Sequence, residues 1–292
     1  MNASLPGMSG PSEQSVTWAE STIGSSVVAS RGLREGGAPW LLRFGDGSEA
    51  VLRTGGAFDT DVAALRLAAA HGVPVPGLLA VGDGLMLLSV VRGTSAIPVE
   101  ATPERLAAYG AAGALLLSIH VTPTAALPLR HRPLELEDFA LVRADNGAPP
   151  LLRAADAALA RLPEPTAETV LVHGDLWQGN TMWHDNELTA ILDWDCAGAG
   201  HPGIDLSGMR LDAALMFGVD AADFVLDGWQ RQAGRPAADL VYWDIVAALS
   251  TPTDFRERWE ATIQDQGRPD LTAALLNARR DEFLAGALDR LT

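Results

Sequence analysis

The residues best suited by type and spacing to chemistry follow two predicted strands in the second half of the chain. Asp175 comes directly after His173-Gly174, and Asn180 lies five residues further on. Asp193 ends the next predicted strand, so a hairpin can return it beside Asp175. Two carboxylates and one carboxamide that converge at strand ends provide the hard oxygen ligands that Mg²⁺ prefers. One carboxylate is then left to orient and deprotonate a hydroxyl, and this set of groups predicts phosphoryl transfer from a nucleotide.

The elements that must position these residues fall into a sheet-rich part and a helix-rich part. Before residue 92, apolar alternation and turn signals predict three strands, a helix and two further strands. After residue 102 helical spacing predominates, interrupted by a strand at 170–172 and a hairpin over His184-Asp185-Asn186. We therefore expect a flexible arm over residues 1–20, a small lobe over 21–91 and a larger lobe over 92–292, with a ligand cleft between the two lobes.

The charge balance limits the partners that the chain can bind. There are 21 Lys and Arg residues against 37 Asp and Glu residues, which gives a net charge of −16. Such a surface repels nucleic-acid phosphates and anionic lipids and attracts cationic small molecules. The N-terminus lacks the pattern of a signal peptide, and no apolar stretch is long enough to cross a membrane. Because Cys196 is the single cysteine, no internal disulfide can form; we expect a soluble, cytoplasmic protein.

Further along the chain, Asp193 is followed by Trp194 and then by Gly200-His201-Pro202-Gly203-Ile204-Asp205-Leu206. In this order and at these separations, the motifs resemble those of the aminoglycoside phosphotransferase family. This family is a branch of the protein-kinase-like fold that also contains choline kinases and macrolide kinases. The resemblance covers nearly the whole chain after about residue 25, and it implies an α+β, two-lobe fold with a small antiparallel sheet and one helix in the first lobe. It rests on His173-Gly174-Asp175-Leu176, Asn180, Asp193-Trp194 and Gly200-His201-Pro202-Gly203-Ile204-Asp205-Leu206.

The resemblance implies a role for each of these residues. Asp175 would be the catalytic base that orients the acceptor hydroxyl, and Asn180 and Asp193 would hold Mg²⁺. His173 would support the loop without acting as an acid or a base. Asp205 would brace the catalytic loop through backbone N–H groups, and it could also be the N-cap of the following helix.

In the first lobe the resemblance implies a binding site for ATP or GTP. Gly36 and Gly37 correspond to the loop that covers the phosphates, and Arg53 occupies the family's lysine position on the third strand. The acidic partner of that residue is Asp61, with Asp59 as the competing candidate. The hinge whose backbone contacts adenine would be formed by Leu88, Ser89, Val90 and Val91.

The acceptor is less defined by the sequence than the nucleotide. Asp195 is either an acceptor contact or a plain loop carboxylate, and Trp243 and Asp244 are candidates because family acceptor pockets are built from the C-terminal helices. The acidity of the chain, with Asp212 among the carboxylates near the site, predicts an acceptor that carries an amine. Aminoglycosides, sugars, amino alcohols and macrolides all remain open, as does a non-catalytic nucleotide- or ligand-binding protein on the same fold. The absence of an Asp-Phe-Gly motif argues against a protein kinase.

Overall fold

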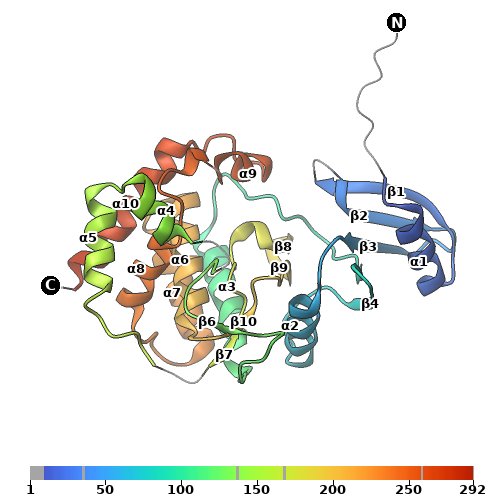
Figure 1. Ribbon diagram of the computed structural model, residues 1–292, viewed down its shortest axis with the longest axis horizontal. Helices are drawn as coiled ribbons and strands as arrows, with labels where there is room; N and C mark the ends of the chain where they lie inside the picture. The colour runs from blue at the N-terminus through green and yellow to red at the C-terminus, as the bar shows by residue number, and fades with distance from the viewer. Residues whose placement is uncertain (1–9, 35–36, 136–137, 167–168, 258, 292) are drawn as a thin grey trace, which may run out of the picture.

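The computed structural model describes residues 10–291 except 35–36, 136–137, 167–168 and 258. It consists of two lobes, with a small sheet on one side and a bundle of helices on the other (Figure 1). This arrangement confirms the two-lobe α+β fold predicted from the sequence. Within the described residues, no helix has both the length and the apolar composition that spanning a bilayer requires.

The first lobe is built on a five-stranded antiparallel sheet in the order β1-β2-β3-β5-β4. One face of this sheet packs on a helix, α1, through Ala19, Trp40 and Leu42, while residues such as Met86 and Leu88 face α2 and the second lobe. The elements are α1 (Glu13–Ile23), β1 (Val27–Arg34), β2 (Gly37–Phe44), β3 (Glu49–Thr54), α2 (Asp59–Ala70), β4 (Leu78–Gly82) and β5 (Leu85–Ser89).

Helix α1 covers part of the stretch for which the sequence analysis predicts a flexible arm. The Ser12 side chain accepts a hydrogen bond from the backbone N–H of Ser15 and so caps the helix. Residues 13–20 are therefore helical, although they were assigned to a flexible arm, and the sheet lobe contains two helices instead of one. Residues 1–9 of that predicted arm lie outside the described residues.

The second lobe is mainly helical and is organised around α6, most of whose residues are buried. Figure 1 shows α6 between α3, α7 and α8. Its helices are α3 (Pro103–Ala114), α4 (Phe139–Asn146), α5 (Pro150–Leu159), α6 (Gly203–Phe217), α7 (Ala221–Ala233), α8 (Leu240–Leu249), α9 (Trp259–Asp265) and α10 (Ala273–Asp289), with 3₁₀ turns at Leu115–Ser118, Gln178–Asn180 and Phe255–Glu257.

Short strands of the second lobe precede the predicted catalytic residues along the chain. A three-stranded sheet has the order β6-β10-β7, and β8 pairs with β9 in a hairpin. Asp185 and Asn186 have positive φ values of 48° and 66°, which suits the two-residue turn that closes this hairpin. The strands are β6 (Leu129–Arg130), β7 (Val170–Val172), β8 (Thr181–His184), β9 (Glu187–Ile191) and β10 (Gly198–Gly200).

Candidate active site

A tight loop between β7 and β8 carries Asp175, and α6 holds this loop in position. Gly174 has a φ of 78°, and a Cβ atom there would collide with the carbonyl oxygen of Cys196, so this position requires glycine. The two carboxylate oxygens of Asp205 accept hydrogen bonds from the backbone N–H groups of His173 at 2.7 Å and Gly174 at 2.9 Å. The N-cap of α6 is Pro202, so Asp205 lies within the first turn and is not the N-cap.

His173 connects the same loop to the end of β9. Its Nε2 lies 2.7 Å from the carbonyl oxygen of Leu192, and its Nδ1 accepts the backbone N–H of Asp175 at 3.3 Å. The ring is fully buried and packs against Trp194. Burial lowers the pKa of His173 to about 4, so the imidazole is neutral near pH 7, with Nε2–H as a donor and Nδ1 as an acceptor.

Asn180 and Asp175 are joined directly. The Asn180 carboxamide N–H donates both to the backbone carbonyl of Asp175 at 2.9 Å and to its Oδ2 at 3.0 Å. Burial, followed by the negative charges of Asp193 and Asp195, raises the pKa of Asp175 to about 8. The site thus concentrates negative charge where a cation would stabilise it.

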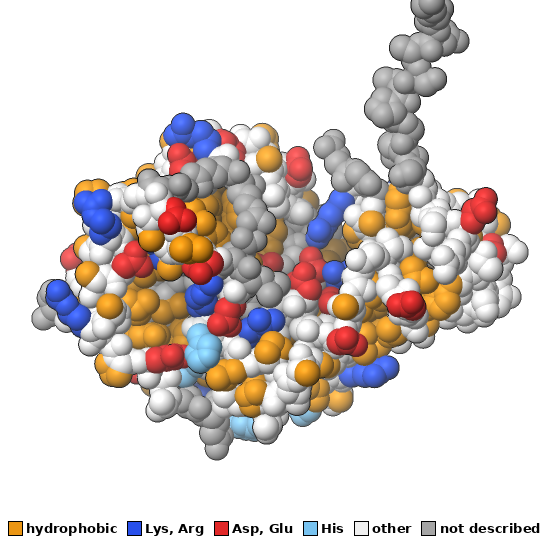
Figure 2. Space-filling view, viewed as in Figure 1, with side chains coloured by type: hydrophobic (Ala, Val, Ile, Leu, Met, Phe, Trp, Pro, Cys, Tyr) orange, Lys and Arg blue, Asp and Glu red, His pale blue; other side chains and the backbone are white. Residues whose placement is uncertain are grey.

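Arg53 connects the first lobe to the hairpin of the second. One of its nitrogens lies 2.6 Å from Asp61 on α2, and another lies 2.9 Å from Asp193. Arg34 on β1 also reaches Asp193, at 3.5 Å. Of the two candidate partners for Arg53, the structure places Asp61 in contact, while Asp59 is exposed to solvent. Acidic and arginine side chains meet at this junction of the lobes in the space-filling view (Figure 2).

The chain contains no lysine, so its only permanently cationic side chains are arginines. Arg53, which the resemblance places at the family's lysine position, is thus one of 21 arginines in a chain without lysine. A guanidinium group has five N–H donors, and those of Arg53 contact two carboxylates at once. Arg34, which the sequence analysis did not select, is a further cation beside the predicted metal ligand.

A cavity of about 490 Å³, here called the nucleotide cavity, opens between the lobes next to Arg53. The hinge prediction requires the hinge to line this cavity, and the lining includes Ser89, Val90 and Val91. The Ser89 N–H donates to the Gly77 carbonyl, which leaves Val90 and Val91 as the hinge residues that could bind a base. Its apolar lining comes from both lobes and includes Leu41, Val51, Leu88, Met182 and Leu192.

Of the two predicted phosphate-loop glycines, Gly36 lies outside the described residues. Gly37 begins β2 and pairs with Arg34 of β1. The described ends of β1 and β2 lie beside the nucleotide cavity, because Arg34 and Ala38 are both part of its lining.

The donor set of Asn180 and Asp193 fits a magnesium ion that accompanies a nucleotide. No group of three or more His, Cys, Asp or Glu side chains in the described part of the chain is arranged to hold a metal by itself. Mg²⁺ in nucleotide sites is usually held by one or two protein oxygen ligands together with substrate phosphates and water. Because the Asn180 amide N–H groups are directed to Asp175, its carbonyl oxygen remains the group available as a ligand.

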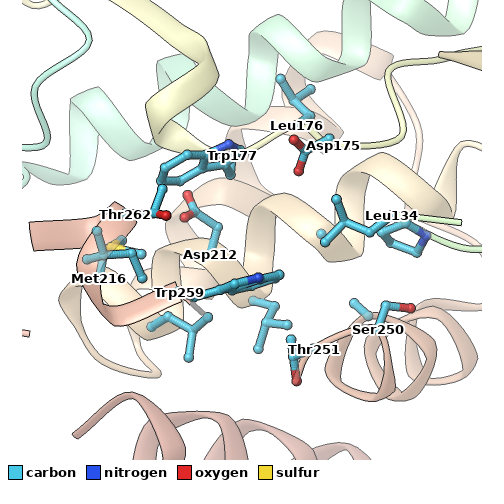
Figure 3. A pocket seen from close by; sticks show the side chains of 16 residues that line it. Leu134, Asp175, Leu176, Trp177, Asp212, Met216, Ser250, Thr251, Trp259 and Thr262 are labelled. Carbon is cyan, nitrogen blue, oxygen red and sulfur yellow. The ribbon is translucent and has the colours of Figure 1, made fainter. Parts of the chain in front are cut away.

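On the other side of Asp175 lies a second cavity, of about 270 Å³, here called the acceptor cavity. Its lining comes from the catalytic loop, α6, α8 and α9. Figure 3 shows Asp212 between Trp177 and Trp259 in this view, with Asp175 at the edge of the group. The sequence analysis missed both tryptophans as site residues, but Asp212 follows Asp205 by two helical turns and so faces the same way.

Two of the predicted acceptor residues are buried and are not among the described residues that line either cavity. Asp244 is 0% exposed and accepts hydrogen bonds from Arg210 at 3.1 Å and from Arg290 at 2.7 Å. Trp243 is also buried, where it stacks on His201 at 4.7 Å between ring centroids. Both belong to the packing of α8, which turns these side chains into the lobe. Asp195 is exposed and is not among the described residues that line either cavity.

Comparisons with known proteins bear on the family and on the fold of the chain. The model of the phosphotransferase enzyme family matches residues 30–249 of the chain. No curated protein sequence matches it.

Solved structures with the same fold include three antibiotic phosphotransferases. Macrolide 2'-phosphotransferase MphH from Brachybacterium faecium has a TM-score of 0.59 and 21% sequence identity, covering 89% of this chain and 96% of that one. Spectinomycin phosphotransferase APH(9)-Ia, solved with ADP and spectinomycin, has a TM-score of 0.62 and 12% identity, covering 94% and 98%. APH(3'')-Id from Streptomyces rimosus, solved with ADP and streptomycin, has a TM-score of 0.50 and 20% identity, covering 80% and 97%. Similarity at these identities shows a shared fold.

Proposed function

Because this chain belongs to the phosphotransferase enzyme family, we propose that it transfers the terminal phosphate of ATP or GTP to a hydroxyl group of a small molecule. The observation that carries this proposal is the position of Asp175. Its carboxyl group lines the acceptor cavity, while Asp193, whose charge acts on it, lines the nucleotide cavity. A carboxylate in the lining of one cavity, close to a second carboxylate in the lining of the other, suits a reaction between two bound substrates.

Different residues around the nucleotide cavity would bind the phosphate groups and the metal ion. Arg53, held by Asp61, would bind phosphate oxygens in place of a lysine. Asn180 and Asp193 would hold Mg²⁺, which when bound neutralises charge on the phosphate groups. Three neighbouring structures of this fold contain ADP or AMP-PNP, and this supports a nucleotide as the phosphate donor.

Asp175 would accept a hydrogen bond from the acceptor hydroxyl and take its proton as the new bond to phosphorus forms. Burial raises the pKa of Asp175 to about 8, so in its ionised form this group is a stronger proton acceptor than an exposed aspartate. His173 and Asp205 would act as positioning residues, because they hold the loop from β9 and α6 through buried hydrogen bonds. Such a fixed loop aligns the reacting atoms without further rearrangement.

The net charge of −16 and the two carboxyl groups in the acceptor cavity favour an acceptor that carries an amine. The single cysteine and the requirement for nucleoside triphosphates favour the cytoplasm as the location.

Nucleotide turnover measured against a panel of hydroxylated metabolites and antibiotics, with ATP or GTP and Mg²⁺, tests this function. We expect phosphorylation of at least one acceptor, and we expect Asp175→Asn to bind nucleotide as the unmodified chain does while losing most of the transfer. Nucleotide binding without transfer to any acceptor would favour the alternative of a non-catalytic binding protein. Near-normal transfer by Asp175→Asn would remove Asp175 from the role of base.

A further inference from the structure

The wall of the acceptor cavity is mostly apolar. Among its described lining residues there is no Lys, Arg or His, and the two ionisable residues are Asp175 and Asp212. The apolar lining includes Leu134, Leu176, Leu211, Leu215, Met216 and Ile263. A ligand that fills this space must therefore bury apolar surface and tolerate negative charge.

The wall contains three hydroxyl groups, those of Ser250, Thr251 and Thr262. Ser250 Oγ donates to the Val246 carbonyl at 2.8 Å, and Thr251 Oγ1 donates to the Ala248 carbonyl at 2.7 Å. Both of these protons are thus used within α8 and its C-terminal end, and the two oxygens can only accept from a ligand. Because the wall offers few polar partners, a ligand with many polar groups would lose water without gaining a matching partner for most of them.

Asp212 has one oxygen in use and one that faces no described donor. Its Oδ2 accepts the Gln178 backbone N–H at 3.1 Å and the Tyr109 hydroxyl at 3.4 Å. The residue is 6% exposed, and burial raises the pKa of Asp212 to about 7. A buried carboxyl group with a free oxygen is stabilised when a cationic donor binds to it.

Two tryptophan rings lie on either side of this carboxyl group in Figure 3. Trp259 is held edge-on by Phe255 at 5.4 Å and by Phe139 at 6.3 Å. The Trp177 ring lies over Gly179, where a Cβ atom would overlap it. Tryptophan faces attract ammonium groups and also accept apolar ligand surface.

We propose that the acceptor is an alcohol with a predominantly apolar body and a single amine, whose ammonium group binds Asp212 between Trp177 and Trp259. Its hydroxyl group then lies at Asp175. This inference rests on the proposed function and narrows its acceptor. A multiply charged, polyhydroxylated acceptor is disfavoured, because the cavity provides one free carboxylate besides Asp175 and a wall that pairs with few polar groups.

A matched pair of small alcohols tests the proposal by binding alone, in the full chain without nucleotide. The amine probe is 2-amino-1-phenylethanol, and its neutral counterpart is 1-phenylpropan-1-ol, in which a methyl group replaces the ammonium group. Streptomycin is the polycationic comparison. Ligand-observed NMR titration measures each affinity, and we expect the amine to bind about tenfold more tightly than the neutral alcohol, a difference near 1.4 kcal/mol.

Three variants test whether the preference for the amine arises in the acceptor cavity. Asp212→Asn keeps an oxygen to accept the Gln178 and Tyr109 hydrogen bonds, and it should abolish the preference for the amine. Asp227→Asn removes an equal charge from the exposed face of α7 and should leave the preference unchanged. Trp259→Leu should weaken binding of the amine probe severalfold while keeping Asp212 in place.

Equal affinities for the two alcohols, no signal from the amine, an unchanged preference in Asp212→Asn, or tighter binding of streptomycin than of the amine would each overturn the proposal. These readouts need no phosphate transfer, so they separate the acceptor class from the proposed function. Turnover on the wider panel with no effect of Asp212→Asn would leave the phosphotransferase standing and remove only the amine site.

Discussion

Arg53 and Asp61 form an ion pair of 2.6 Å beneath the nucleotide cavity, and Asp61 is almost completely buried. The pair joins β3 to α2, and the second nitrogen of Arg53 then reaches Asp193 on the opposite lobe at 2.9 Å. The guanidinium group of Arg53 thus spans the two lobes by contacting one carboxylate on each.

Replacing Arg53 should lower both nucleotide affinity and stability, because the side chain contacts Asp61 and Asp193. Arg53→Ala leaves Asp61 buried without its cation, so we expect nucleotide affinity to fall at least tenfold and the free energy of unfolding to fall by about 1–3 kcal/mol. Arg53→Lys should lose less affinity, because it keeps a positive charge for the phosphates but cannot contact both carboxylates in the same way. Calorimetric titration with nucleotide and denaturant unfolding measure these effects.

The exposed neighbour Asp59 provides the control for the pair. Asp59→Asn should change neither nucleotide affinity nor stability beyond about 0.5 kcal/mol, whereas Asp61→Asn should weaken nucleotide binding. If both variants behaved alike, the ion pair would have no special part in holding Arg53.

Asp193→Asn should raise the Mg²⁺ concentration needed for nucleotide binding. Asparagine offers a neutral oxygen in place of an anionic one, which weakens a site for a hard cation. The measurement is nucleotide affinity as a function of Mg²⁺ concentration, with Asp195→Asn as a neighbouring carboxylate that lines neither cavity. A Mg²⁺ dependence identical to that of the unmodified chain would exclude Asp193 as a ligand.

Replacing Asp244 should lower the stability of the fold and leave the KM for the acceptor nearly unchanged. Asp244→Ala leaves Arg210 buried without its carboxylate, and we expect the free energy of unfolding to fall by about 3–5 kcal/mol. The KM for the acceptor should remain within about twofold, measured at a temperature where the variant is folded. Asp227→Ala on an exposed face should change neither quantity. An acceptor KM that rose strongly in Asp244→Ala would return this residue to the site.

His173 should make the folded chain sensitive to acid. Its pKa is about 4 when folded and near the ordinary value of 6.5 when unfolded, so between these values the unfolded chain binds a proton that the folded chain does not. Stability should therefore fall as the pH falls from 6.5 to 4, by at most about 3 kcal/mol from this residue.

Protonation of two neighbouring carboxyl groups has the opposite effect on stability, over an overlapping pH range. Burial raises the pKa of Asp205 to about 6 and that of Asp212 to about 7, so protonation of these groups favours the folded chain. His173→Gln isolates the imidazole, because glutamine can still donate to Leu192 but does not titrate. Compared with the unmodified chain, the variant should lose less stability between pH 6.5 and 4.5 in denaturant unfolding. Equal pH slopes would show that His173 protonates freely in the folded chain.

Local chemistry in the sequence was sufficient to predict the catalytic hairpin and the order of its polar residues. Gly174 permits a tight loop, and Asp185-Asn186 favours a two-residue turn, so His173, Asp175 and Asp193 come together over short chain distances. The same holds for α3, which begins with Thr102 as its N-cap and Pro103 in the first turn. Helix α4, with eight residues, offers only about two turns of such a pattern.

Only the tertiary structure decided which carboxylates face a ligand. Helix α8 is apolar on nearly every side and is largely buried, so no polar stripe in its sequence indicates which way Asp244 points. That direction depends on Arg210, which lies on another helix and contacts it from 34 positions away. The acceptor cavity likewise joins Leu134, Trp177 and Trp259 from distant segments. Contacts between remote segments depend on how whole helices pack, and this packing cannot be inferred from the periodicity of any one of them.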